Sequence, residues 1–122
     1  MVTPYEGRDI RADPLEHLLR VPLDPVLVDA ARLRIMAAVI GLPAEGRLSF
    51  TALRRLLVMT DGNLGMHLRV LSELGYIEAA RQTRGRRRQS LYASTPMGRA
   101  AFSAHVDALQ AIIAAAKGES EF

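Results

Sequence analysis

The 122-residue chain contains no cysteine and no tryptophan, and aromatic residues make up only 5% of it. The absence of cysteine excludes disulfide bonds, thiolate metal sites and cysteine nucleophiles. Since aromatic residues are scarce, the core of a chain that is 49% hydrophobic must consist of leucine, isoleucine, valine, alanine and methionine. The length fits one domain.

Two kinds of segment are also missing. The N-terminal stretch MVTPYEGRDI carries charges and has no apolar run, so it is not a signal peptide. No stretch approaches the roughly 20 apolar residues that a membrane-spanning helix needs. We therefore expect a cytoplasmic protein that does not interact with membranes.

Signatures of catalysis and metal binding are absent from the sequence. The three histidines, at positions 17, 67 and 105, are far apart and have no zinc-ligand spacing. The chain has no GxSxG motif and no glycine-rich nucleotide-binding motif. We expect a protein that is not an enzyme and that uses no metal and no cofactor.

What the chain has in abundance is arginine, which supplies 15 of its 16 basic residues. The net charge is only +3, but residues 47–99 hold ten arginines against three acidic residues, which is a local charge of +7. A basic middle between acidic flanks is typical of a unit that binds a polyanion. A GC-rich genome is an alternative explanation for the preference for arginine over lysine, but it does not explain the clustering.

Hydrophobic spacing predicts a mainly helical protein. We predict helices over residues 26–41, over residues 48–57 from near Ser49 or Thr51, and over residues 61–74. Thr60 suits the N-cap of the third helix, and Gly75 suits a left-handed C-cap. Because about three residues join the second and third helices, they form a helix-turn-helix.

Further helices are predicted at the two ends of the chain. Asp13-Pro14 is a typical helix start and predicts one or two turns before Pro22. Thr95-Pro96 is a second such start, and it predicts a long final helix that ends at Gly118.

Between residues 76 and 94 the period changes from helical to alternating. The runs YIEAARQ and RQSLYAS predict two strands of a hairpin, with Gly85 in the turn. We call this hairpin the wing. Five arginines lie toward its tip: Arg81, Arg84, Arg86, Arg87 and Arg88. We expect them to contact phosphates or to enter a minor groove, although a charge run is also typical of a solvated surface.

The helix over residues 61–74 has two distinct faces. Leu64, Leu68 and Leu71 share the inward face. Gly62 and Gly65 make the other face unusually small, at a cost of about 1 kcal/mol each relative to alanine. A helix whose N-terminal end approaches DNA closely has a reason to carry both. The predicted DNA-contacting set is Thr60, Gly62, Asn63, Gly65, Met66, His67 and Arg69.

Several of these residues have a second interpretation. Asn63 either bonds adenine or helps to cap the helix, and Met66 either touches a thymine methyl group or is simply exposed. Arg69 would meet a phosphate or a guanine. His67 lies at the flank of the inward face and is either a packing residue or a phosphate donor.

The final helix carries an apolar stripe nearly 20 residues long, which one small domain would not cover. We expect homodimerisation through Phe102, Val106, Leu109, Ile112 and Ile113. The alternative is that this helix packs only within its own chain.

The stretch from Leu23 to about Ile113 resembles bacterial winged-helix transcriptional regulators of the ArsR/MarR type. The resemblance rests on Leu23-Asp24-Pro25, on residues 60–64 (TDGNL), on residues 67–71 (HLRVL), on Gly75-Tyr76, and on residues 95–99 (TPMGR). Gly65 departs from the pattern, since relatives often have serine there. The metal ligands of arsenical repressors have no counterpart.

The resemblance implies a mainly α fold with a small β-hairpin: a winged helix-turn-helix with N- and C-terminal helical dimerisation elements. It divides the chain into an N-terminal extension (1–25), a DNA-binding domain (26–95) and a dimerisation helix (96–122). The implied function is a sequence-specific, homodimeric repressor that binds double-stranded DNA. The alternatives are a protein-interaction module and a nonspecific nucleic-acid-binding protein. A small-molecule effector of unknown class is a further partner that the sequence leaves open.

Overall fold

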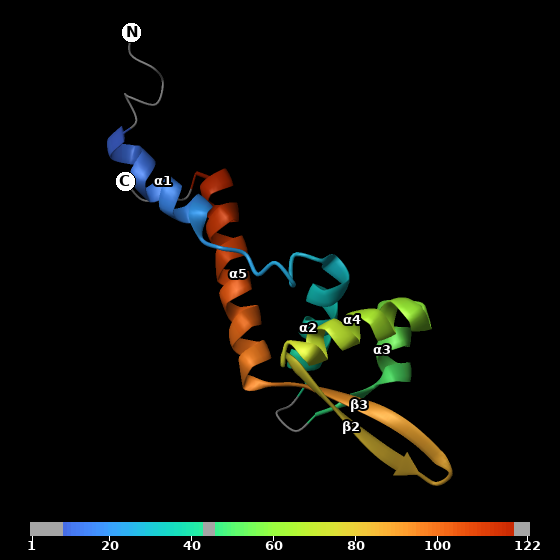
Figure 1. The fold of residues 1–122 in the computed structure, drawn as a ribbon. Coiled ribbons are helices and arrows are strands. Elements are labelled where there is room, and N and C mark those ends of the chain that lie inside the picture. Colours follow the sequence, from blue (N-terminus) through green and yellow to red (C-terminus); the bar gives the residue numbers. More distant parts are fainter. Residues whose placement is uncertain (1–8, 43–45, 119–122) are drawn as a thin grey trace. The chain divides into compact units, whose positions relative to one another are not determined.

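The computed structural model describes residues 9–42 and 46–118 (Figure 1). The chain divides into two compact units. One is the Asp24–Phe102 unit, and the other combines the residues before it with those from Ser103 onward.

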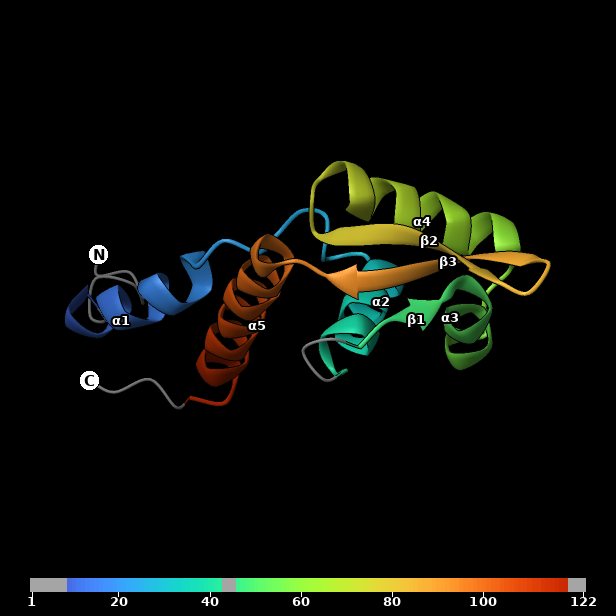
Figure 2. The ribbon, with the colours of Figure 1, turned by 90° about the horizontal axis from the view of Figure 1, so that it is seen from below.

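The Asp24–Phe102 unit contains three helices and a three-stranded antiparallel sheet, and it ends in the first residues of a further helix (Figure 2). In chain order the elements are α2 (Ala30–Ile40), β1 (Leu48–Ser49), α3 (Phe50–Leu57), α4 (Asp61–Glu73), β2 (Ile77–Arg84), β3 (Arg87–Ser94) and the start of α5 (Pro96–Ala116). The strand order is β1-β3-β2. The predicted fold class, a mainly α winged helix-turn-helix with a hairpin, is confirmed.

The core of this unit is aliphatic, as the shortage of aromatic residues requires. It is formed by Leu27, Ile35, Met36, Val39, Leu53, Leu64, Leu68, Leu71 and Ile77, each 2% exposed or less. Burying one such side chain contributes about 1.5–3 kcal/mol. The predicted inward face of α4 supplies three of these residues, so the core sets which face of α4 is left outside.

The start of α2 differs from the prediction of a helix over residues 26–41. A turn occupies residues 25–28, where Asp24 Oδ1 accepts hydrogen bonds from the backbone N–H groups of Val26 (2.8 Å) and Leu27 (3.3 Å). The helix begins after Asp29, which caps it by accepting from the N–H of Arg32. Short aspartate side chains compete with the helix for backbone donors, and here that competition delays the helix by four residues.

The prediction for the first helix was also wrong in extent. α1 runs from Asp9 to Arg20 and holds Pro14 inside it rather than at its start. Proline has the helical φ angle, and its cost inside a helix is one lost hydrogen bond and a crowded preceding turn. Twelve residues form about three turns instead of one or two. Residues 1–8 of the predicted N-terminal extension lie outside the described residues.

Strand β1 was not predicted. Its two residues pair with β3, with Leu48 opposite Tyr92 and Ser49 opposite Leu91. Two residues are too few to show an alternating pattern in sequence, so only pairing with a distant strand reveals them. Ser49 then caps α3 by accepting from the N–H of Ala52 at 3.0 Å, which confirms the predicted helix start.

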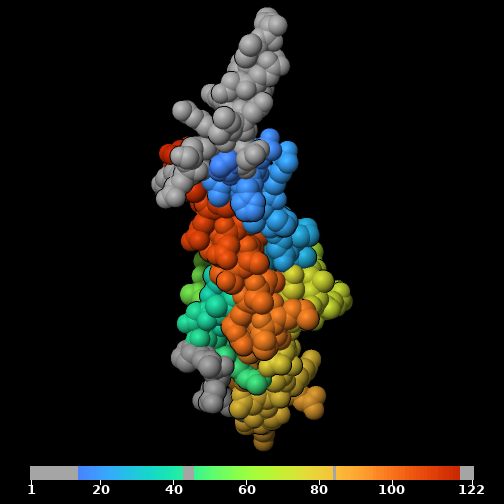
Figure 3. Space-filling model, turned by 90° about the vertical axis from the view of Figure 1, so that its left-hand side faces the viewer, coloured from blue at the N-terminus to red at the C-terminus, as the bar shows by residue number. Residues whose placement is uncertain are grey.

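Helix α5 is 21 residues long, and Figure 3 shows its surface as a continuous run from orange to red. Its start is capped by Thr95, as predicted, because Thr95 Oγ1 accepts from the N–H of Gly98 at 2.9 Å. Gly118, with φ of +69°, follows its end. Within residues 9–42 and 46–118, no helix is long and apolar enough to cross a membrane.

Candidate nucleic-acid interface

The turn between α3 and α4 spans residues 58–60 and is held by backbone contacts. Val58 takes a left-handed conformation with φ of 52°, which costs a non-glycine residue about 1–2 kcal/mol. Its N–H and that of Met59 both donate to the carbonyl oxygen of Arg54. Thr60 then caps α4, with Oγ1 accepting from the N–H of Asn63 at 3.2 Å. The predicted helix-turn-helix and its N-cap are confirmed.

The other end of α4 is closed by the predicted left-handed glycine. Gly75 has φ of 79°, its N–H donates to Ser72, and the N–H of Tyr76 donates to Leu71. This pair of bonds is a Schellman motif. The Tyr76 hydroxyl donates to Asp24 Oδ2 at 2.6 Å, and this hydrogen bond is the main reason that the pKa of Tyr76 rises to about 12. These contacts fix where α4 ends and β2 begins.

The outward face of α4 is polar, small and exposed. Gly62, Asn63, Met66 and Arg69 are all exposed, and Met66 keeps half of its surface in solvent. A Cβ atom added at Gly62 or Gly65 would have no heavy atom within 4 Å. Neither glycine is therefore required by packing within the chain, and this face offers a smooth surface with a few hydrogen-bonding groups.

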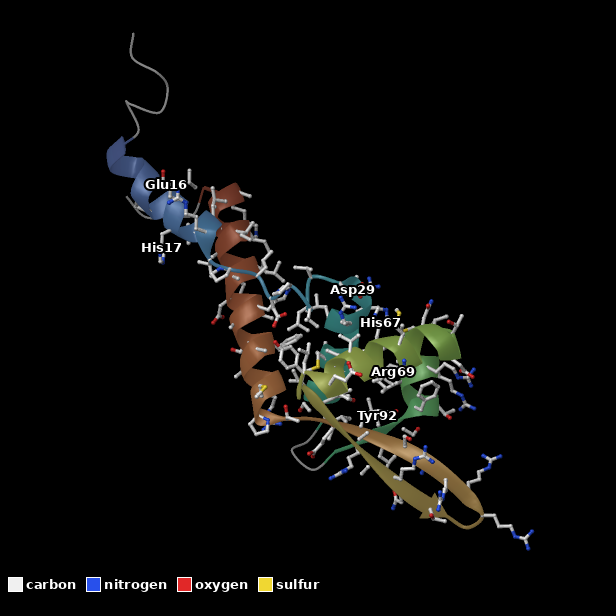
Figure 4. The ribbon with its side chains drawn as sticks, in the orientation of Figure 1. Glu16, His17, Asp29, His67, Arg69 and Tyr92 are labelled. Atoms are coloured by element: carbon white, nitrogen blue, oxygen red, sulfur yellow. The ribbon has the colours of Figure 1, made fainter. Side chains whose placement is uncertain are left out.

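His67 lies at the flank of the buried face of α4. It is 8% exposed and is labelled in Figure 4. Its Nδ1 is 3.3 Å from Arg32 Nη1 on α2. Arg32 also donates from Nε to the carbonyl oxygen of Val26 at 2.7 Å. Backbone N–H donation from Arg32, followed by attraction to its charge and to His67, lowers the pKa of Asp29. Of the two interpretations of His67, this geometry favours the packing residue.

The hairpin of β2 and β3 is regular, with eight paired positions that end at Arg84 opposite Arg87. The two-residue turn begins at Gly85, whose φ of +64° is what a type II′ turn requires at its first central position. The wing predicted from the alternating pattern is confirmed as a hairpin. Arg81, Arg86, Arg87 and Arg88 are exposed, and the side chain of Arg84 lies outside the described residues.

The register of β2 and β3 places the wing arginines on different faces of the hairpin. Side chains alternate along a strand, and directly paired residues share a face. Arg81 and Arg88 therefore belong to the face of Ile77, which is buried in the core, and Arg87 belongs to the opposite face. Arg86 is in the turn. The wing thus presents positive charge on both faces and at the tip, so it can follow a backbone from more than one side.

In both ribbon views the hairpin tip and the N-terminal end of α4 lie toward the same end of the Asp24–Phe102 unit (Figures 1 and 2). The start of α4 and the arginine-bearing tip of the wing thus lie at one end of this unit. Phe102, which the sequence assigned to dimerisation, packs against the core of this unit instead of standing free.

Sequence reasoning missed one feature of this surface. Arg54, in the last turn of α3, forms an ion pair with Asp61, the first residue of α4, at an Nε–Oδ1 distance of 3.2 Å. The separation of seven residues is longer than the i,i+3 and i,i+4 spacings at which charged side chains pair within one helix, so no local pattern indicates it. The α3–α4 turn brings the two side chains together.

A second contact that sequence reasoning missed joins the connection between α4 and β2 to the start of α5. Gly98 is buried, and a Cβ atom there would overlap the backbone carbonyl of Tyr76. Thr95 donates from Oγ1 to the carbonyl oxygen of Gly75 at 2.5 Å. The segment TPMGR therefore holds the start of α5 against the end of α4.

A protein-family comparison matches residues 31–113 to the winged helix DNA-binding domain. This match covers more than half of the chain. The chain belongs to the winged helix DNA-binding domain family. No curated protein matches it.

Several solved structures have a similar fold. A transcriptional regulator homologue from Pyrococcus horikoshii OT3 has 23% identity and a TM-score of 0.67, over 83% of this chain and 94% of the other. A mutant of MarR from E. coli has 20% identity and a TM-score of 0.63, over 97% and 86%. A MarR family regulator from Streptomyces coelicolor, solved in complex with DNA, has 21% identity and a TM-score of 0.56, over 93% and 79%.

These comparisons confirm the expected resemblance to small winged-helix regulators and the DNA-binding character of the domain. The matched family is a DNA-binding domain, and the structural likeness supports the same fold. In the part of the chain that the structure describes, no group of three or more histidine, aspartate and glutamate side chains is arranged to hold a metal ion.

Proposed function

We propose that this winged-helix protein is a sequence-specific transcriptional repressor that binds double-stranded DNA as a homodimer. The observation that carries the proposal is the outward face of α4, where a Cβ atom added at Gly62 or Gly65 would meet no heavy atom within 4 Å, although both glycines weaken the helix. Close approach of the helix to a base-pair edge in a major groove explains why side chains are missing at these two positions.

The proposal assigns different work to α4 and to the wing. Asn63, Met66 and Arg69 on α4 contact base edges, and Thr60 lies at the phosphate beside them. Arg81, Arg84, Arg86, Arg87 and Arg88 contact phosphates or a minor groove and supply most of the affinity. His67 is buried, so we assign it a packing role that supports α4 instead of a direct contact with DNA.

The homodimer is proposed from α5. Leu109 and Ile112 are only partly buried, and Ile113 keeps 49% of its surface exposed. A second copy would cover these side chains together with Val106. Two recognition helices related by a two-fold axis would then meet half-sites about one helical turn of DNA apart. We expect repression instead of activation, because no activation module is evident in the sequence. The bound dimer would repress by occluding the DNA.

The test begins with duplexes selected by the wild-type protein from a randomised pool. Affinity for a selected duplex and for a scrambled one is then measured over a salt series. We expect log K to fall with log salt for both, and the selected duplex to bind at least about 1,000-fold more tightly. No salt dependence would favour a protein-interaction module, and equal affinity for both duplexes would mean nonspecific binding.

Three variants separate the roles. Removing Arg86 and Arg87 (R86A/R87A) should weaken both duplexes alike and lower the salt slope by about 1 per arginine. Asn63→Ala should reduce the preference for the selected duplex. Arg20→Ala is a control that removes one exposed arginine outside the proposed interface, and it should change each affinity by less than half as much as the double wing substitution.

A further inference from the structure

A carboxylate lies at the edge of the proposed DNA-contacting face. Asp61 is the first residue of α4, and 77% of its side chain is exposed. It directly precedes Gly62 and Asn63 on that face. A carboxylate close to the DNA backbone is repelled by phosphates, so this residue opposes binding wherever the site offers only phosphate.

Arg54 holds this carboxylate in place. Its side chain reaches Asp61 from α3, while its backbone carbonyl accepts the N–H groups of Val58 and Met59 in the turn. One residue thus organises both the turn and the first side chain of α4. The exposed ion pair contributes little to stability, and the place of Asp61 in the first turn of α4 adds a small favourable interaction with the helix dipole.

We propose that Asp61, oriented by Arg54, is a specificity-determining residue. It favours a base edge that carries an amino group, cytosine before adenine, and it lowers the affinity for all other DNA. This inference rests on the proposed function, because it assumes that α4 faces base pairs.

The chemistry of base edges supports this assignment. An ionised carboxylate only accepts hydrogen bonds. In the major groove cytosine and adenine present amino donors, whereas guanine presents two acceptors that a carboxylate repels. Asparagine pairs with adenine and acidic residues pair with cytosine, so cytosine is the expected partner of Asp61. Arg54 contacts Asp61 through Nε. The four other N–H donors of its guanidinium group are suited to hydrogen bonds with a phosphate.

The experiment compares Asp61→Asn with Glu73→Gln. Both substitutions raise the net charge by one at an exposed position of α4. Glu73 is the last residue of this helix and lies about 18 Å from Asp61 along the axis. Affinity is measured for the wild-type-selected duplex and for its scrambled version, and the duplex pool is selected again with each variant. Thermal unfolding by circular dichroism checks that both variants fold.

We expect Asp61→Asn to bind the scrambled duplex at least about threefold more tightly than the wild type does, because one repulsion near a phosphate is removed. The ratio of selected to scrambled affinity should fall about tenfold, and renewed selection should lose a cytosine at one position of each half-site. Glu73→Gln should leave the ratio and the selected sequence unchanged. Arg54→Gln should lower the ratio in the same direction, because the carboxylate loses its orientation.

The outcomes separate this inference from the proposed function. If the wild type itself shows no preference between duplexes, the proposed function is wrong. If the wild type discriminates and Asp61→Asn and Glu73→Gln have equal effects on the ratio, the inference about Asp61 is wrong. If Arg54→Gln lowers stability and both affinities without changing the ratio, the ion pair is structural and the orienting role of Arg54 is wrong.

Discussion

At the scale of single residues, glycines of the Asp24–Phe102 unit serve opposite purposes. Gly98 is buried where the backbone of Tyr76 leaves no room for a Cβ atom. Gly62 and Gly65 face open space. The residue type is the same, but the first is required by packing within the chain, and the other two have no such requirement.

Gly98→Ala should therefore destabilise the fold. The added methyl group would overlap a backbone carbonyl, which cannot move aside as a flexible side chain can. We expect a loss of about 3 kcal/mol in the free energy of unfolding, measured with urea. Gly65→Ala is the control and should raise that free energy by about 0.5–1 kcal/mol. Equal stability of the two variants would contradict the packing role of Gly98.

Gly65→Ala has a second consequence, for DNA binding. Because the added methyl group stabilises α4, any loss of affinity for the selected duplex must arise at the interface rather than from unfolding. We expect that loss to reach about tenfold, equivalent to about 1.4 kcal/mol. An alanine variant that is more stable and binds the selected duplex as tightly as the wild type would remove the reason for proposing close approach at this position.

Tyr76 predicts a dependence of stability on alkaline pH. Its pKa is about 12 in the folded protein against 10.0 for an ordinary tyrosine, mainly because its hydroxyl donates to Asp24. The stabilisation is complete below pH 10 and is lost as the pH rises through 12. Tyr76→Phe should lose about 1–2 kcal/mol at pH 8, measured by urea unfolding. The difference from the wild type should narrow between pH 10 and 12, and a constant difference would contradict this assignment.

At the scale of elements, α2 packs against the buried side of α4 and holds it in position. Arg32 contacts His67 through Nη1 and the turn before α2 through Nε, so one side chain links α2, that turn and α4. His67→Ala should lower the free energy of unfolding by about 2–3 kcal/mol, because it leaves a cavity and removes a partner of Arg32. DNA affinity should fall for all duplexes alike. Weaker DNA binding at unchanged stability would instead make His67 a phosphate donor.

The elements were predictable to different degrees. The leucine stripe, Thr60 and Gly75 specify α4 because capping and helical periodicity act within about 15 residues of chain. The start of α2 was misplaced because two aspartates capture backbone N–H groups, and nothing in the hydrophobic pattern indicates this. Strand β1 was missed because only a pairing partner more than 40 residues away makes it a strand.

At the scale of the whole molecule, the apolar stripe of α5 divides between two kinds of environment. Phe102 packs on the core of the Asp24–Phe102 unit, whereas Ile113 keeps half of its surface exposed. The sequence shows one continuous stripe. The structure assigns its first residue to the core of one unit, and we propose the later ones for dimerisation.

Ile113→Glu should therefore convert a dimer into a monomer, because a charge buried in an apolar interface is costly. We expect a halved mass by sedimentation and weaker binding to a two-half-site duplex. Phe102→Ala is the contrasting variant and should lower the free energy of unfolding by about 3 kcal/mol. A wild type that sediments as a monomer, or an Ile113→Glu variant that still sediments as a dimer, would argue against this interface.

By itself, the sequence determined the helix-turn-helix, the hairpin, the aliphatic core and the clustering of arginine on the wing. Those features depend on periodicity, capping and composition, which act over short stretches of chain. Only the tertiary structure decided that His67 is buried against Arg32, that Gly98 lies against Tyr76, and that Arg54 pairs with Asp61. Each of these joins residues from different elements, and such contacts exist only after the elements have packed.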